Sequence, residues 1–289
     1  MAEVQVRYAF SDPALFDLVA IYIESSVTGD GAATDMMPPD MASIRIGLSG
    51  EWCSGSSKES LAPETHASML SGPTSHARWL SGKGGKGFAV GLQPLAWPCL
   101  FAAKASQFAE IDTPLEALWV TDTGALVAQL ITCPDFESRV EAVNHFLLAK
   151  RGHADADLAA QLAAVRLALA DPECASVEDL AARAGMSQSR LLRLTMATYG
   201  FTPKLLIRKE RFRRMLHRAD FLSYENWREF IEQQYVDQSH LIRDFKRFLG
   251  LAPSQYMALE RPFVAAGFAE ARRLLGSPQA DGDPIRAAG

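Results

Sequence analysis

The sequence predicts an α+β chain: a β-rich N-terminal domain of jelly-roll or small-barrel type, a helical connector, and an all-α C-terminal domain with two helix-turn-helix units. Three observations predict this fold class. Short apolar runs alternate at period two between Gly, Pro and Ser clusters before residue 104. Apolar residues recur at helical spacing after residue 115. One helix-turn-helix pattern occurs twice near the C-terminus.

Chain length and turn residues predict the domain organisation. At 289 residues the chain is long enough for two hydrophobic cores. We expect a β-rich domain at 1–104, a helical connector at 105–172, the double helix-turn-helix domain at 173–262, and a short helix with a disordered tail at 263–289. The tail is rich in Pro, Gly and Asp and almost without apolar residues.

Charge is distributed unevenly along the chain. The formal net charge is -5, yet residues 183–261 hold fifteen Lys and Arg against eight Asp and Glu. This segment is therefore +7 and the remainder is -12. A basic domain joined to an acidic one is typical of DNA-binding proteins. The alternative is a basic helix that is merely solvated.

Cysteine spacing and hydropathy predict the cellular compartment. Cys53, Cys99, Cys133 and Cys174 form no C-x-x-C pair, which argues against a zinc ribbon or a disulfide framework and favours reduced thiols. The N-terminus lacks the charged-then-apolar pattern of a signal peptide, and no apolar run approaches the roughly 18 residues of a membrane span. We expect a cytoplasmic protein without a membrane partner.

The expected N-terminal elements follow from apolar patterning and turn residues. Residues 15–23 predict a short helix that runs into a strand, and the Gly, Pro and Asp content of 28–40 predicts a loop. Alternation at period two predicts a half-buried strand at 42–52, and a second strand is expected at 88–92.

Apolar residues at helical spacing predict four connector helices, at 115–120, 126–131, 136–151 and 155–173. The Asp-Pro pair at 171–172 breaks the last of them. A change in the N-terminal domain could pass to the C-terminal domain across this short joint.

The first helix-turn-helix unit begins at Ser176, a good N-cap, with Asp179 at the capping-box position. Gly185 supplies the backbone freedom for a tight turn. Ser187 caps a second helix, in which Leu191 faces inward.

The second unit repeats this logic with other residues. Asp237 is the candidate N-cap, Leu241, Phe245 and Phe248 form an apolar stripe, and Gly250 ends the helix. Both units close on a Gly that is followed three residues later by a Pro. A repeated helix-turn-helix of this kind is typical of a protein that binds DNA.

The pattern D-Q-S-H-(apolar)-x-R-D-F-K-R-x-x-G-x-x-P-x-x-Y at 237–256 resembles the second helix-turn-helix signature of AraC-type (AraC/XylS family) transcriptional regulators. The resemblance covers about 175–260. It implies two recognition helices, at 187–198 and 237–249, that enter successive major-groove segments on one face of the duplex, with 203–219 as a rigid spacer.

A second resemblance concerns residues 87–101, which are similar to the end of the N-terminal sensing domain in one branch of the same family. In that branch, the helices that follow commonly carry dimer contacts. This resemblance implies a sensing domain and a homodimer, and it brings no known ligand.

The sequence departs from the family pattern in both units. Thr195, Met196 and Ala197 stand where the family has Phe and two basic residues, which predicts a weaker core anchor and fewer phosphate contacts in the first unit. In the second unit, Gln234 replaces the turn glycine and Phe230 a small residue, which predicts a bulkier scaffold helix.

Outward-facing side chains at the starts of both recognition helices are the candidate DNA contacts, because Arg can grip guanine and Gln adenine at two points. The expected base readers are Gln188, Ser189 and Arg190 in the first unit and Gln238, Ser239 and Arg243 in the second. The expected phosphate contacts are Arg193, Lys246, Arg247 and the basic residues within 208–214.

Other chemistries find little support in the sequence. The glycine-rich stretch 82–87 resembles a phosphate cradle, but Lys86 is not followed by Ser or Thr, so a mobile hairpin loop is favoured. His66 and His76 lack the spacing of a cupin metal site, and His240 belongs to the recognition-helix pattern. We expect no catalytic residues, no metal and no cofactor. The nearest enzymatic alternative is a repair protein with a methyl-accepting cysteine. Such a protein would need clustered cysteines, which this chain lacks.

Taken together, these patterns predict a transcriptional regulator that binds double-stranded DNA, responds to a small-molecule effector or partner at its N-terminal domain, and forms a homodimer; RNA polymerase is a candidate partner. The alternative is an architectural or partner-dependent DNA-binding module whose N-terminal domain only oligomerises. A ligand-dependent shift in melting temperature would favour the first function, and dimers indifferent to metabolites the second.

Overall fold

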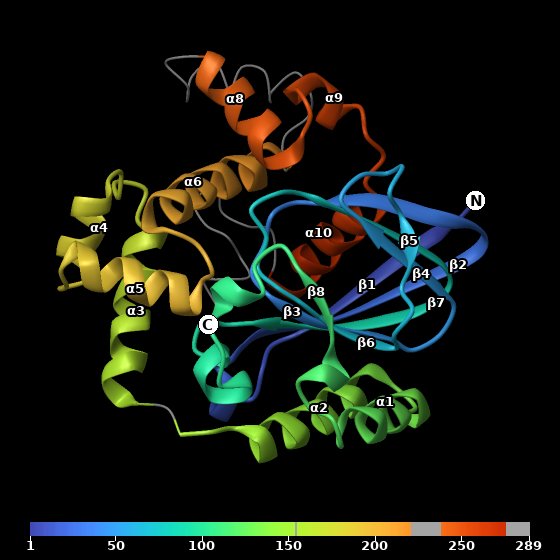
Figure 1. The fold of residues 1–289 in the computed structure, drawn as a ribbon. Helices are drawn as coiled ribbons and strands as arrows, with labels where there is room; N and C mark the ends of the chain where they lie inside the picture. The colour runs from blue at the N-terminus through green and yellow to red at the C-terminus, as the bar shows by residue number, and fades with distance from the viewer. Residues whose placement is uncertain (154, 221–237, 276–289) are drawn as a thin grey trace.

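The computed structural model describes residues 1–153, 155–220 and 238–275 (Figure 1). An antiparallel sheet forms the N-terminal part, and the C-terminal part is helical. The predicted α+β fold class is therefore confirmed. Within these ranges, no helix is long and apolar enough to cross a membrane.

Some predictions fall on residues that the structure does not describe. They concern Phe230 and Gln234 in the scaffold of the second unit, the N-cap at Asp237, and the C-terminal tail beyond residue 275. They remain predictions from the sequence.

One eight-stranded sheet dominates the N-terminal part. Its path is β1-β2-β7-β3-β6-β8, and β4 pairs with β7 and β5. All the pairings are antiparallel. The strands are β1 (Glu3–Ala9), β2 (Val19–Met37), β3 (Ser43–Gly47), β4 (Glu51–Gly55), β5 (Ala62–Pro63), β6 (Ser68–Ser71), β7 (Arg78–Leu92) and β8 (Asp112–Pro114).

The loop predicted at 28–40 is wrong over most of its length, because β2 continues to Met37. A register shift between Val27 and Ala32 interrupts its pairing with β7, which then resumes. Gly29 has φ 85° at this irregularity. The turn-type residues therefore build a bulge inside a long strand and do not end it.

The hairpin loop predicted at 82–87 is also wrong, because these glycines lie within β7 and pair with β2 and β4. A Cβ atom at Gly82 would lie 2.7 Å from the Trp52 ring, and one at Gly85 would lie 2.1 Å from the carbonyl oxygen of Ser49. The glycines are needed because neighbouring strands approach β7 closely.

The connector helices are α1 (Thr123–Thr132), α2 (Phe136–Lys150) and α3 (Ala156–Ala170), close to their predicted positions. The helix expected at 115–120 is only a 3-10 turn, η4 (Leu115–Ala117). Arg139 in α2 is buried and donates to Glu24 of β2 at 2.9 Å, and this ion pair fixes α2 to the sheet.

After α3, the described ranges contain the helices α4 (Val177–Arg183), α5 (Gln188–Thr198), α6 (Pro203–Asp220), α8 (Gln238–Leu249), α9 (Pro253–Met257) and α10 (Pro262–Leu275). The predicted caps of the first unit are confirmed. Ser176 accepts the amide of Asp179 at 3.0 Å, and Ser187 accepts the amide of Arg190 at 3.3 Å. Gly185 has φ 64°, a left-handed conformation that favours glycine at this turn.

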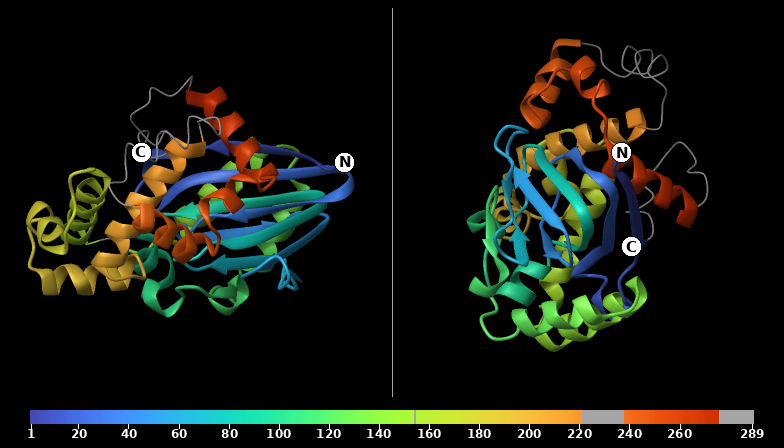
Figure 2. Two further views of the ribbon diagram at one scale, coloured as in Figure 1. Left: turned by 90° about the horizontal axis from the view of Figure 1, so that it is seen from above. Right: turned by 90° about the vertical axis from the view of Figure 1, so that its right-hand side faces the viewer.

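Helix α10 returns to the N-terminal sheet and packs along β1 and β2 (Figures 1 and 2). Phe263 at its start is buried with Val27 and Ala33 of β2. A Cβ at Gly267 would lie 2.4 Å from the hydroxyl oxygen of Tyr8. The sequence predicted a short helix here but gave no sign of this contact, which ties the end of the described chain to its beginning.

Candidate nucleic-acid interface

Helix α5 exposes every residue that the sequence assigned to DNA contact in the first unit: Gln188, Ser189, Arg190 and Arg193. Leu191, 0% exposed, anchors the opposite face in the core. These polar side chains therefore lie on the outward side of α5, as a major-groove helix requires.

Arg190 has a partner within the protein, because its Nε atom donates to Oε1 of Gln161 in α3 at 3.2 Å. Arg193 is exposed one turn further along α5. The structure thus places Arg190 against the connector helix and leaves Arg193 on the outward surface.

The departures of the first unit from the family pattern have structural counterparts. Thr195 is 0% exposed, and its hydroxyl donates to the carbonyl of Leu192 at 3.3 Å. Met196 and Ala197 are half-buried and supply no charge. A threonine thus occupies the core position, and α5 has no basic residue in its last turn.

Helix α8 presents the second unit's polar face. Ser239, Arg243, Lys246 and Arg247 are exposed, and Nε of Arg243 donates to the carbonyl of Ser239 at 3.1 Å. Gln238 opens the helix, and its side chain lies outside the described part of the structure.

An aromatic cluster holds α8 in place. Phe245 and Phe248 are 0% exposed and pack against Phe212 of α6, with ring centroids 5.2 Å and 4.9 Å apart. Tyr256 of α9 is also 0% exposed and lies edge-on to Phe245 at 5.8 Å. The stripe predicted from the sequence is therefore the core of this unit.

The two units repeat in structure as they do in sequence. The first residues of α5 and α8, Gln188 and Gln238, are fifty positions apart, and so are Gly200 and Gly250. Both glycines have positive φ, 83° and 73°. A residue of α5 therefore has its counterpart fifty positions later in α8.

The basic residues within 208–214, which the sequence predicts as phosphate contacts, have partners within the protein, and phosphate contact by them stays a prediction. Arg208 and Arg211 both donate to Asp244 of α8, at 2.6 Å and 3.3 Å. Asp244 is 1% exposed, so its charge needs these partners. The sequence analysis did not single out Asp244, and only its apolar neighbours Leu241 and Phe245 hinted at its burial.

Two further arginines of α6 also stabilise the protein. Arg213 pairs with Glu210 at 2.6 Å, and both side chains are largely buried. Arg214 donates to the carbonyls of Leu169 and Ala170 at 3.0 Å and 2.9 Å, which caps the C-terminus of α3. A spacing pattern along one helix shows that these cations are neighbours but does not show which groups they meet.

The N-terminal part contacts the helix-turn-helix region directly. Lys209 of α6, 7% exposed, donates from Nζ to the carbonyls of Asp40 and Thr74 at 2.6 Å and 2.7 Å. The amide of Ala77 donates to the carbonyl of Phe248 in α8 at 2.7 Å. The joint after α3 is therefore not the sole link between the two parts. No local sequence pattern marks Lys209 as such a link.

A third contact joins Asp35 of β2 to α10. The carboxylate is 0% exposed and accepts the amides of Val264 and Met36 at 2.9 Å and 2.7 Å. Burial raises the pKa of Asp35 from 3.8 to about 6, although these hydrogen bonds and Arg261 act in the opposite direction.

We expect the stability of the chain to depend on pH through Asp35. Because its pKa is higher in the folded chain than in the unfolded one, its contribution is full below pH 4 and is lost as pH rises through about 6. The free energy of unfolding should fall by about 2–3 kcal/mol across this window, at about 1.4 kcal/mol per pKa unit. Denaturant unfolding from pH 4 to pH 7 measures this, with Asp35→Asn as the variant that should flatten the slope. An unchanged slope in the variant would contradict the assignment.

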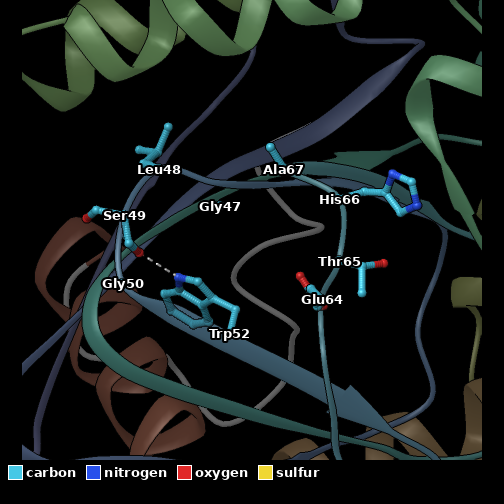
Figure 3. A pocket seen from close by; sticks show the side chains of 9 residues that line it. All are labelled: Gly47, Leu48, Ser49, Gly50, Trp52, Glu64, Thr65, His66 and Ala67. Carbon is cyan, nitrogen blue, oxygen red and sulfur yellow. Dashed lines mark hydrogen bonds between the residues drawn. The ribbon is translucent and has the colours of Figure 1, made fainter.

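The hollows on the described surface include two that the N-terminal part lines. The first, of about 170 Å³, lies between the turn after β3 and residues 64–67, beside Trp52 (Figure 3). The indole nitrogen of Trp52 donates to the carbonyl of Ser49 at 3.0 Å, as the dashed line shows (Figure 3). This hollow is smaller than the roughly 300–1,000 Å³ of most ligand sites.

The second hollow measures about 460 Å³ and lies between three regions of the chain. Pro98 and Lys104 line it from the N-terminal part, Leu158 from α3, and Leu194 and Ala197 from α5. It is mainly apolar, and it borders the first recognition helix.

In the part of the chain that the structure describes, no three His, Cys, Asp or Glu residues are grouped to hold a metal ion. Nδ1 of His66 instead lies 2.6 Å from Oε1 of Glu116. Cys53, Cys99, Cys133 and Cys174 are free thiols.

Comparison with known proteins places the helical region in a family. Residues 180–258 match the family model described as a helix-turn-helix domain. The match begins within α4 and ends one residue after α9, so it spans both units. No curated protein matches the chain.

Several solved structures are similar to this chain. ToxT from Vibrio cholerae O395 is 12% identical, with a TM-score of 0.42, over 89% of this chain and 96% of ToxT. Wild-type ToxT from Vibrio cholerae strain SCE256, bound to an unsaturated fatty acid, is 12% identical, with a TM-score of 0.40, over 89% and 94%. The AraC-like transcriptional activator CuxR is 14% identical, with a TM-score of 0.27, over 77% and 90%.

Proposed function

Because residues 180–258 match a helix-turn-helix family model and residues 237–256 resemble the AraC-type signature, we propose that the chain is an AraC-type regulator that binds DNA sequence-specifically and regulates transcription. Recognition helices α5 and α8 would enter successive major-groove segments of one duplex. The repeat carries this proposal, because both helices expose polar residues at corresponding positions and bury their apolar faces. Helix-turn-helix units are a common DNA-binding motif, and we propose no enzymatic activity.

The repeat also changes which residues of the first unit we expect to contact bases and which we expect to contact phosphates. Arg193 is the counterpart of Arg243, fifty positions later, whereas Arg190 corresponds to His240. Arg190 is bonded to Gln161 in α3. We therefore propose Arg193 as the principal residue of α5 that contacts bases, with Gln188 and Ser189 beside it. Arg190 would lie nearer the sugar-phosphate backbone of the DNA.

Selection of bound DNA tests the proposed function. Purified protein is mixed with fragments of its own genome at moderate salt, and the retained fragments are sequenced. We expect one motif to be enriched over bulk DNA, since specific sites typically exceed non-specific ones by about 10³–10⁷ in affinity. Retention without any enriched motif, falling steeply with salt, would show only backbone binding and would contradict the proposal.

We expect Arg243→Ala and Lys246→Ala to weaken DNA binding in different ways. Loss of Arg243 should cost about 1–3 kcal/mol at one base position and relax the preference there. Loss of Lys246 should weaken all sequences alike and lower the salt slope by about one. Titrations of the selected site and of single-base variants at several salt concentrations measure both. The reverse pattern would overturn the division into readers and phosphate contacts.

We further propose that a small molecule bound at the N-terminal domain changes the placement of the two units. The contacts of Lys209 in α6 with Asp40 and Thr74, and of Ala77 with Phe248 in α8, support this, because movement of the sheet would move those helices. The 460 Å³ hollow beside α5 is the candidate effector site. A metabolite that raises the melting temperature of the full chain would support the binding of a small-molecule effector.

The alternative function, an architectural module whose N-terminal domain only oligomerises, gains some support from α1 and α2. Ile131 and Leu148 on these helices are 53% and 38% exposed, and apolar residues of this kind suit a subunit contact. We propose a cytoplasmic homodimer for either function, and RNA polymerase remains a candidate partner. Stable dimers whose melting is indifferent to metabolites would favour the architectural module.

A further inference from the structure

Two large aliphatic side chains are exposed on the recognition helices. Leu192 of α5 is 44% exposed and Ile242 of α8 is 40% exposed. Each directly follows a core residue, Leu191 or Leu241, which is 0% or 3% exposed. The helices are thus anchored without Leu192 and Ile242, and packing does not explain these two aliphatic residues.

Exposure alone would prove little, since single apolar residues are common on protein surfaces. Leu167 of α3, for example, is 69% exposed. The informative feature is the register, because Leu192 and Ile242 are fifty positions apart and occupy the same place in the repeat. Each also directly precedes an exposed arginine, Arg193 or Arg243.

The position of the two side chains on their helices suits contact with base edges. Leu192 lies three residues after Ser189, and Ile242 lies three residues after Ser239. Residues at this spacing share a helix face, so each aliphatic group lies on the exposed polar side that would enter the groove. An aliphatic group there cannot form a hydrogen bond, and it needs an apolar partner.

The major groove offers one such partner, the C5-methyl group of thymine. We propose that Leu192 and Ile242 are specificity-determining residues that each pack against a thymine methyl group, one in each half of the DNA site. This inference rests on the proposed function. It adds a chemical prediction that the polar readers do not make: each half-site contains an A·T pair whose thymine is recognised by its methyl group.

Deoxyuridine substitution tests this directly. Deoxyuridine pairs as thymine does but lacks the methyl group, so replacing thymines one at a time in the selected site removes one methyl at a time. We expect one position in each half-site at which affinity falls about fourfold, the value for losing one buried methyl-sized group. The other thymines should show no change.

Matched variants assign each methyl group to its reader. Leu192→Ala should bind thymine and deoxyuridine equally at one position and keep the discrimination at the other, and Ile242→Ala should do the reverse. Leu167→Ala, an exposed leucine outside the recognition helices, should keep both. Since none of the three side chains belongs to the buried core, the variants should unfold close to the wild-type denaturant concentration, which confirms that they are folded.

Three results would overturn the inference. An enriched site in which no deoxyuridine weakens binding would refute the methyl contacts and leave the proposed function standing. Variants that retain full discrimination would assign the methyl contacts to other residues. Absence of any enriched sequence would overturn the proposed function and this inference with it.

Discussion

Phe248→Ala is expected to lower the free energy of unfolding by about 3–5 kcal/mol, the usual cost of truncating a fully buried phenylalanine. Phe248 is 0% exposed and stacks on Phe212 with ring centroids 4.9 Å apart. Its removal leaves a cavity between α6 and α8 at the point where the carbonyl of residue 248 meets Ala77 of the N-terminal part. The second unit should therefore lose its fixed position.

Denaturant unfolding and DNA titration measure the two consequences of Phe248→Ala. Ile242→Ala is the matched control for stability, because this residue of the same helix is 40% exposed and its truncation should change stability by no more than about 0.5 kcal/mol. Specific DNA binding by the Phe248 variant should approach the non-specific level. Equal stability losses in the two variants would contradict the described packing.

Lys209→Met is expected to lower the free energy of unfolding by about 3–6 kcal/mol, because it removes two charge-assisted hydrogen bonds worth about 1.5–3 kcal/mol each. The ammonium group reaches from α6 to the carbonyls of Asp40 and Thr74. Methionine keeps the apolar stem of the side chain but leaves these carbonyls without their cation. The loss should be local to the contact between the sheet and α6.

Hydrogen exchange locates this loss. The amides of Thr74 and Ala77, which donate to the carbonyls of Asp40 and Phe248, should exchange faster in the Lys209 variant. Lys204→Met, at an exposed position of the same helix, is the control and should leave both amides unchanged. If the two variants behave alike, Lys209 does not join the two parts of the chain.

Local patterns predicted local structure well. Period-two alternation located β3, in which Ile44 and Ile46 are both 2% exposed. Cap residues located α4 and α5 because Ser176 and Ser187 bond to amides three residues away. These interactions lie within a single turn of chain, so the sequence alone specifies them.

Predictions failed where the partner lies far along the chain. The glycines at 82–87 suggested flexibility, but the structure uses them to admit Trp52 and Ser49 from neighbouring strands. The arginines of α6 were visible as a basic cluster, but nothing in the local sequence shows that Asp244 and the end of α3 engage several of them. Likewise, no local pattern predicts that the carboxylate of Asp35 accepts a hydrogen bond from the amide of Val264 in α10.

The candidate DNA-binding residues were predictable because they follow from the same repeat that predicted the helices. Their exposure agrees with a DNA-facing role, and base contact by them remains a proposal. Leu192 and Ile242 could have been found from the sequence by aligning the two units, since both follow a core leucine and precede an arginine. They are apolar, whereas the residues predicted to contact DNA are all polar or charged.

The central claim is that two equivalent helices read one DNA duplex. The most direct test is to repeat the selection of bound DNA with Arg193→Ala and Arg243→Ala beside the wild-type protein. The wild type should enrich two elements about one helical turn, or roughly 10 base pairs, apart. Each variant should lose preference in a different element. A single element, or the same element lost by both variants, would contradict a two-unit reader.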